Sequence, residues 1–177
     1  MLYLFWDTER IKGSKIYMLA YILTNENFET IKQQTIINAA VDISNRKSPK
    51  SKVKRLSVSS QTVVDFKEMA NIMLPLFAQS KSVCFGKDDF AAFNQSLREN
   101  ELEQVTGTFY NIEEFIRKCL VDFPTNLKSI SEHLGIKHDR HNPLSDSTVA
   151  KGCFIHLLRD YSLNQMEYKI PSRNISK

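Results

Sequence analysis

The chain has 177 residues, of which 42% are hydrophobic, and this size and composition are typical of a single globular domain. Its formal net charge of +4 is too small to indicate a nucleic-acid partner by itself. The three cysteines, Cys84, Cys119 and Cys153, form neither a disulfide framework nor a zinc-binding spacing, and no stretch approaches the ~20 apolar residues that span a bilayer. No charged leader is recognisable either, so we expect a soluble, cytoplasmic protein without a membrane partner.

The first quarter of the chain is patterned as strands. Residues 2–6 form a short continuous apolar run, which is typical of a strand buried on both faces. Residues 15–24 and 33–39 are rich in β-branched and aromatic side chains, and the polar residues 25–27 between them favour a turn. Together these segments predict a three-stranded antiparallel unit.

A basic stretch follows these strands. No acidic residue occurs between Asp42 and Asp65. The basic residues in this interval are Arg46, Lys47, Lys50, Lys52, Lys54 and Arg55. Two interpretations stay open: a solvated surface loop, or a flap that neutralises the phosphates of a nucleic acid.

The rest of the chain alternates between helical and strand patterns. Helical spacing predicts helices near residues 66–77, 90–97, 112–120, 126–134 and 143–161, with short strands at 80–85 and 108–112. This alternation predicts an α/β fold in which helices cover both faces of a mixed sheet. We expect one domain over residues 1–161 and a polar tail over residues 162–177.

Asp7 and Glu9 stand at the end of the first predicted strand. Because they are two residues apart, their side chains project from the same face. Their mutual repulsion would be relieved by a hard cation such as Mg²⁺ or Mn²⁺. The alternative is an ordinary solvated strand end, with both carboxylates in water.

Two later segments carry further candidates. Asp89 follows the strand predicted at 80–85, at the strand end where open α/β sheets place their ligands, although Asp88 or Asp89 could also simply cap the next helix. Near the C-terminus, Asn142 is a predicted N-cap, so that Asp146 falls just over one turn into the last helix. His141 is the one histidine with an aspartate five residues later, and an imidazole can take a proton near neutral pH.

Taken together, these residues resemble the DEDDh exonucleases, a branch of the ribonuclease H-like superfamily. That family carries a strand ending in Asp-x-Glu, a central aspartate after a second strand, and a late His-x-x-x-x-Asp. Here the three motifs are Phe5-Trp6-Asp7-Thr8-Glu9, Phe85-Gly86-Lys87-Asp88-Asp89 and His141 to Asp146. The similarity covers roughly residues 2–158. One departure is Arg10-Ile11-Lys12-Gly13, where the family often has Thr-Thr-Gly after the glutamate.

The resemblance implies a mixed five-stranded sheet of the ribonuclease H-like type, with the antiparallel unit joined to parallel strands. It implies that Asp7, Glu9, Asp89 and Asp146 hold two divalent cations, Mg²⁺ or Mn²⁺, while His141 acts as general base. The reaction would remove nucleoside 5′-monophosphates from the 3′ end of single-stranded DNA or RNA. Residues expected to bind the substrate are Thr8, Arg10, Lys50, Lys52, Lys54 and Arg55.

Two other functions stay open at this stage. The same fold could serve as a nucleic-acid-end-binding module with weak catalysis that acts with a partner, which the basic stretch and the altered residues after Glu9 favour. An endonuclease of the wider ribonuclease H-like group also uses clustered carboxylates, but the late His-x-x-x-x-Asp argues against it.

Overall fold

The structure, a computed structural model, describes residues 1–11, 15–41 and 61–170. Within these ranges seven strands form one sheet in the order β4-β3-β2-β1-β5-β6-β7. Their bounds are β1 Tyr3–Arg10, β2 Ile16–Thr24, β3 Thr30–Asn38, β4 Gln61–Val64, β5 Lys81–Cys84, β6 Gly107–Asn111 and β7 Glu167–Ile170.

The sheet is mixed, as expected. β1, β2 and β3 are consecutive antiparallel neighbours, which confirms the three-stranded unit. β5 continues the sheet parallel to β1, and β6 continues it parallel to β5. The α/β class and the mixed sheet, with an antiparallel unit joined to parallel strands, are therefore confirmed.

The sheet has two strands more than the predicted five. β4 pairs in parallel with β3, and β7 pairs antiparallel with β6, so both lie at the edges. Each has only four residues, and no residue of either is fully buried, so the apolar pattern that marks a central strand is missing. Residues 162–170, the first part of the predicted polar tail, form the 3₁₀-helix η2 (Leu163–Met166) and then β7.

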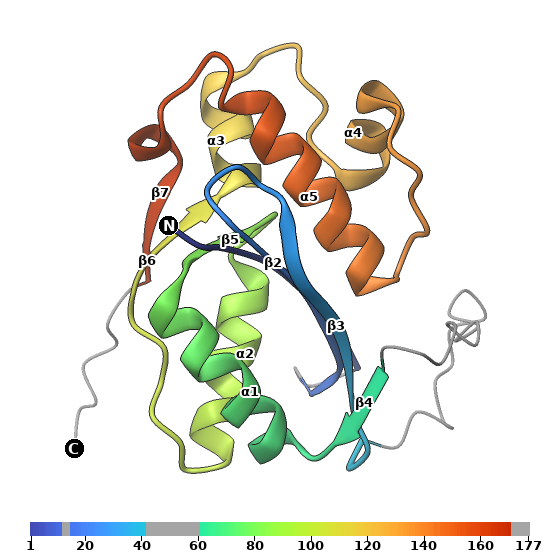
Figure 1. Cartoon of the computed structure of the whole chain (residues 1–177), viewed down its shortest axis with the longest axis vertical. Helices are drawn as coiled ribbons and strands as arrows, with labels where there is room; N and C mark the ends of the chain where they lie inside the picture. Colours follow the sequence, from blue (N-terminus) through green and yellow to red (C-terminus); the bar gives the residue numbers. More distant parts are fainter. Residues whose placement is uncertain (12–14, 42–60, 171–177) are drawn as a thin grey trace.

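Helices cover both faces of the sheet (Figure 1). On one face lie α1 (Phe66–Gln79) and α2 (Asp88–Glu99). On the other lie α3 (Ile112–Cys119), α4 (Leu127–Leu134) and α5 (Pro143–Leu157). All five match predicted helices, although α5 ends four residues before the predicted Tyr161. None of these described helices is long and apolar enough to cross a membrane.

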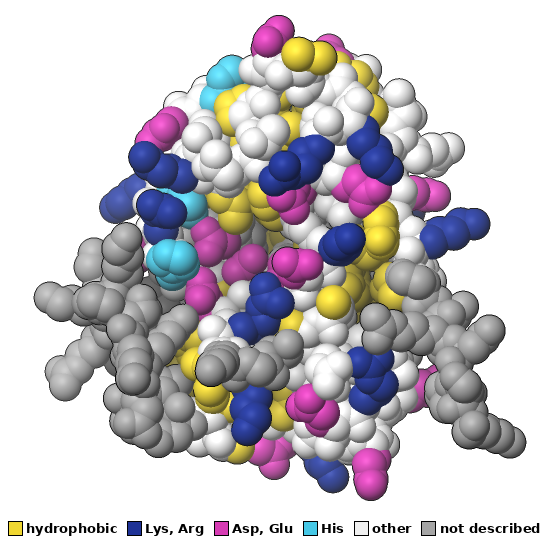
Figure 2. Space-filling model, turned by 180° about the vertical axis from the view of Figure 1, so that it is seen from behind, with side chains coloured by type: hydrophobic (Ala, Val, Ile, Leu, Met, Phe, Trp, Pro, Cys, Tyr) yellow, Lys and Arg dark blue, Asp and Glu magenta, His cyan; other side chains and the backbone are white. Residues whose placement is uncertain are grey.

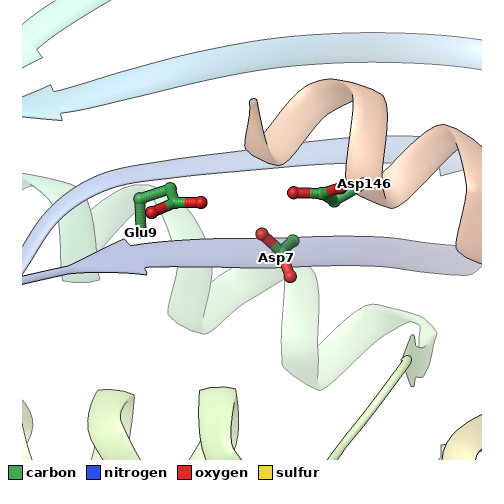
Figure 3. Close-up of side chains that lie close together, drawn as sticks. All are labelled: Asp7, Glu9 and Asp146. Atoms are coloured by element: carbon green, nitrogen blue, oxygen red, sulfur yellow. The ribbon is translucent and has the colours of Figure 1, made fainter. Parts of the chain in front are cut away.

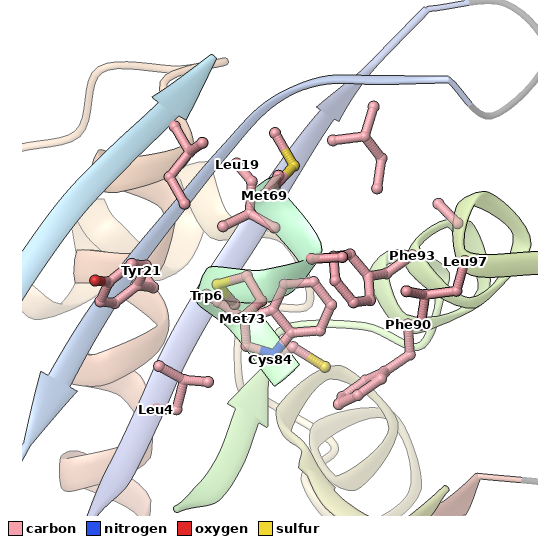
Figure 4. Close-up of a cluster of buried hydrophobic side chains, with 14 of the residues drawn as sticks. Leu4, Trp6, Leu19, Tyr21, Met69, Met73, Cys84, Phe90, Phe93 and Leu97 are labelled. Carbon is pink, nitrogen blue, oxygen red and sulfur yellow. The ribbon is translucent and has the colours of Figure 1, made fainter. Parts of the chain in front are cut away.

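β1 lies at the centre of the core, and its two faces serve different layers. Leu4 and Trp6 pack with α1 and α2, as Figure 4 shows for part of this cluster. Tyr3 and Phe5 point to the opposite face, where their rings contact Phe154 of α5 at centroid distances of 5.8 and 5.6 Å. The alternation of side chains along a strand therefore decides which layer each later residue of β1 meets.

β1 does not end at Asp7, where its apolar run stops. It continues to Arg10, because pairing with β2 persists to the register Arg10 with Ile16. Asp7 and Glu9 thus extend the α5 face of a paired strand, while Thr8 extends the face of α1 and α2. Backbone pairing holds the acidic residues in place more firmly than a loop would.

Candidate functional site

Three carboxylates meet between β1 and α5. Oxygens of Asp7, Glu9 and Asp146 all lie within 4.8 Å of one another. Figure 3 shows Asp7 and Glu9 on the same side of β1, below the first turns of α5, from which Asp146 points toward them. The structure therefore brings together three of the four predicted metal ligands in one cluster.

The start of α5 places Asp146. Asn142 caps the helix by accepting hydrogen bonds from the backbone N–H groups of Leu144 and Ser145, and Pro143 occupies the first turn. The predicted cap is therefore confirmed. Asp146 lies one turn further along the helix, 8% exposed, facing β1.

A second histidine, which the sequence did not single out, holds Asp146. His138 Nε2 lies 2.5 Å from Asp146 Oδ1, and the His138 side chain is only 7% exposed. Its Nδ1 is buried and has no hydrogen-bond partner among the described residues. His138 lies in the loop before α5, so no helical or strand periodicity relates it to Asp146, and the turn of this loop brings its ring back to the helix. Its position in the same loop as His141 was the only available signal.

His141 lies at the open side of the cluster. Its Nδ1 is 3.5 Å from Glu9 Oε1, and its side chain is 53% exposed. Its backbone has a φ of 61°, in the left-handed region, within the turn that precedes α5. The structure thus places the predicted general base beside the carboxylates and in contact with solvent.

Asp89 reaches the site from the other layer of the fold. It lies in the first turn of α2, 8% exposed, and its Oδ1 accepts hydrogen bonds from Thr8 N at 3.2 Å and Thr8 Oγ1 at 2.5 Å. It is not one of the three residues within 4.8 Å, but its charge raises the pKa of Asp7. Asp88 is exposed, so of the two neighbours Asp89 is the one that faces the cluster.

The cluster is short of positive charge. Burial raises the pKa of Asp7 well above its usual value, and the charges of Asp89, Asp146 and Glu9 raise it further. Burial also raises the pKa of Asp89 to about 6, despite the opposing hydrogen bonds from Thr8, and raises that of Asp146 despite His138. Buried carboxylate oxygens that repel one another are the donor set that a hard divalent cation satisfies, so these residues fit Mg²⁺ or Mn²⁺.

The predicted substrate-binding residues fall into three groups. The hydroxyl of Thr8 is buried and donates a hydrogen bond to Asp89, so this side chain orients a predicted metal ligand. Arg10 is exposed, and one guanidinium nitrogen donates to the backbone carbonyl of Asp88 at 3.3 Å. The basic residues Lys50, Lys52, Lys54 and Arg55 lie outside the described residues.

The face of the molecule that carries the site has both negatively and positively charged side chains. In Figure 2, acidic side chains gather near the middle of this face, with histidine beside them and lysine and arginine around them. Such a surface combines a place for cations with a rim that attracts anions.

Comparisons with known proteins identify the fold. No protein-family model matches the chain, and no curated protein sequence matches it. Solved structures do match. A 3′-exonuclease, solved in a study of 3′-end specific recognition of a histone mRNA stem-loop, is 16% identical with a TM-score of 0.65, covering 97% of this chain and 91% of its own.

Two further solved structures agree with this match. The nuclease domain of 3′hExo, a DEDDh family member bound to rAMP, is 15% identical with a TM-score of 0.61, covering 90% of this chain and 91% of its own. Exonuclease I of E. coli, in complex with a dT13 oligonucleotide, is 13% identical with a TM-score of 0.65, covering 88% of this chain and 40% of its own. The chain therefore has the fold of the DEDDh exonucleases.

Proposed function

We propose that this protein is a 3′→5′ exonuclease that depends on divalent cations and removes nucleoside 5′-monophosphates from single-stranded nucleic acid. The observation that carries the proposal is the meeting of Asp7, Glu9 and Asp146 within 4.8 Å, with His141 beside them, on a fold shared with 3′-exonucleases. Structures of that fold hold an RNA stem-loop and a DNA oligonucleotide, which supports nucleic acid as the substrate class.

The metal-holding residues are Asp7, Glu9, Asp89 and Asp146, with Asp7 between the others on the central strand. Two bound Mg²⁺ or Mn²⁺ ions would supply stabilisation of the negative charge on the attacking and leaving oxygens. Thr8 and His138 each hydrogen-bond one of these carboxylates, which keeps its oxygens oriented.

His141 is the proposed general base. Its Nδ1 faces Glu9, which favours the tautomer with a proton on Nδ1 and leaves Nε2 to take the proton of a water molecule. Because the side chain is about half exposed, both water and the end of a strand can reach it. The proton can then pass to solvent, so each cycle begins with a neutral imidazole.

The test is a digest of 5′-labelled single-stranded DNA and RNA with Mg²⁺, Mn²⁺ or EDTA, resolved at single-nucleotide steps. We expect a ladder that shortens from the 3′ end, with no product in EDTA. Asp7→Asn should lower the rate by ~10³-fold, since several kcal/mol of charge stabilisation depend on the cations. Asp160→Asn changes an exposed aspartate beyond the C-terminal end of α5, whereas Asp146 lies in the first turn of that helix, so this variant should leave the rate unchanged.

Further variants and a closed substrate separate the alternatives. Asp89→Asn should cost far more activity than Asp88→Asn, and His141→Ala should lower the rate without loss of folded structure. A circular single strand should stay intact, whereas its cleavage would indicate an endonuclease. Full activity of Asp7→Asn in a carefully purified sample would overturn the proposal, and tight binding without cleavage under every metal would favour the end-binding module.

A further inference from the structure

A groove of about 400 Å³ runs along α2, on the flank where β6 and β7 end the sheet. Its apolar part includes Phe109 of β6 and Tyr168 of β7, whose ring centroids are 5.1 Å apart. Tyr168 is half-buried, so part of its ring faces the groove. β7 lies beyond the residues that carry the family resemblance, so this wall is a feature of the structure and not of the motifs.

The groove begins at the acidic site. Arg10 lines it and also lines the neighbouring hollow, together with Thr8, Glu9 and Ile11. The guanidinium of Arg10 donates to the backbone carbonyl of Asp88 in the groove, and its charge lowers the pKa of both Asp7 and Asp89, so Arg10 is close to the carboxylates as well as to the groove. From there the groove follows α2, whose 12 residues extend ~18 Å.

The groove is cationic where the acidic cluster is anionic. Among the described residues that line it, the cationic side chains are Arg10, Lys87 and Arg98, and the one carboxylate is Asp88. Arg98 donates to the side-chain oxygens of Gln104 and Gln95, which are uncharged partners that orient the guanidinium without neutralising it. Its full positive charge is therefore available to an anion in the groove.

These features fit a nucleic-acid strand. Carboxylates repel phosphates, so a strand whose end lies at the acidic cluster needs cationic surface for the phosphates that follow. An exposed aromatic face beside such a track can stack a nucleobase of any identity. We infer that this groove binds the nucleotides of a single strand that lie upstream of the one being removed, an inference that rests on the proposed exonuclease function.

The test measures binding as a function of strand length. The protein is titrated into labelled single-stranded oligonucleotides, from a dinucleotide upward, with Ca²⁺ as the divalent cation. Fluorescence anisotropy gives the affinity, and the titration is repeated at increasing salt concentrations. Lys87→Gln and Arg98→Gln should each weaken the binding of long strands and reduce the magnitude of the salt slope by about 1. Arg98 lies in the last turn of α2, so a dinucleotide that ends at the acidic cluster is too short to reach it and should bind to Arg98→Gln as before. Tyr168→Ala should weaken long-strand binding by ~5- to 100-fold, and Tyr168→Phe, which keeps the ring, should restore it.

The matched control is Lys169→Gln. Lys169 neighbours Tyr168 on β7, is exposed and does not line the groove, since alternate residues of a strand face opposite ways. Lys169→Gln removes one positive charge, as Arg98→Gln does, but from a residue outside the groove, so equal losses for the two variants would overturn the inference. Equal losses for the dinucleotide and the long strand in Arg98→Gln would overturn it too.

Failure of this inference and failure of the proposed function give different results. Anisotropy needs no cleavage, so a protein that binds long strands through the groove but never shortens them contradicts the exonuclease alone. If the protein shortens strands but all groove variants bind them as the wild type does, the inference about the groove is contradicted and the exonuclease proposal is not. Thermal unfolding of each variant shows whether the fold is intact, and Lys87 and Arg98 are exposed residues whose change to glutamine leaves the core untouched.

Discussion

The two helices that deliver carboxylates to the site begin in different ways. α5 has a local start, with Asn142 as cap and Pro143 in the first turn, and Asp146 follows inside the helix. α2 begins at Lys87 without a side-chain cap. Its carboxylate, Asp89, is held instead by Thr8, a residue 81 positions earlier in the chain.

Both carboxylates nevertheless depend on an anchor outside their own helix. Asp146 contacts His138 on the α5 side of β1, and Asp89 accepts from Thr8 on the α2 side. A cap decides where a helix starts, whereas the anchor decides where a carboxylate oxygen points. Helix position and ligand orientation are therefore separate properties that different variants can change.

The largest expected effect is a pH dependence of stability in the metal-free protein. The pKa of Asp89 is about 6 in the fold, against ~3.9 in an unfolded chain, so the folded state keeps a proton that the unfolded state releases. Its contribution to the free energy of unfolding is thus fully present below pH ~4 and is lost as the pH rises through ~6, on the order of 3 kcal/mol.

Urea unfolding in EDTA across this pH range measures the loss. Asp89→Asn should flatten the curve, and Asp146→Asn, whose native carboxyl pKa is also raised by burial, should flatten it in the same direction. Excess Mn²⁺ should restore stability at the upper end of the range, because the ions favour ionised carboxylates. A curve that is unchanged in Asp89→Asn would show that Asp89 does not hold a proton in the fold.

The next effect tests the anchor of Asp146. His138→Leu should weaken Mn²⁺ binding by ~10- to 100-fold, because Asp146 loses the hydrogen bond that orients it. His138→Gln, which can place a donor near the position of Nε2, should recover part of the affinity. Isothermal titration calorimetry gives the affinity directly, without any need for cleavage.

The metal-free protein provides the counterpart measurement. His138→Leu removes the Nδ1 that is buried without a partner among the described residues, but it also removes the Nε2 hydrogen bond to buried Asp146, so metal-free stability should fall by about 1–3 kcal/mol. His133→Gln changes an exposed histidine of α4 and serves as the control. An unchanged Mn²⁺ affinity in His138→Leu would mean that Asp146 is oriented by its helix alone.

The smallest effect concerns the caps. Asn142→Ala should destabilise the protein by about 1 kcal/mol, since two backbone N–H groups of α5 lose their acceptor. Lys87→Ala should change stability by less than about 0.5 kcal/mol, because Lys87 makes no capping hydrogen bond. Chemical denaturation of both variants in parallel checks the contrast, and equal losses would remove the distinction between the two helix starts.

Local patterns predicted most elements of the fold. Periodic apolar residues marked all five helices and the strands of the centre of the sheet, since burial on one face requires that period. They failed for β4 and β7, which are four-residue edge strands with no fully buried residue. They also predicted an end of β1 that is too early. The strand extends to Arg10 because its backbone pairs with β2, and this pairing leaves no apolar signal in the sequence.

For the site, the sequence by itself determined the chemical groups and their order. The period of two along β1 places Asp7 and Glu9 on one face, and the cap at Asn142 places Asp146 just inside a helix, because both relations depend only on local backbone geometry. Tertiary structure alone decided that Asp89 is held by Thr8, that His138 holds Asp146, and that Tyr168 flanks a cationic groove. Those contacts join different elements, and the packing of the layers, which no local pattern encodes, sets their distances.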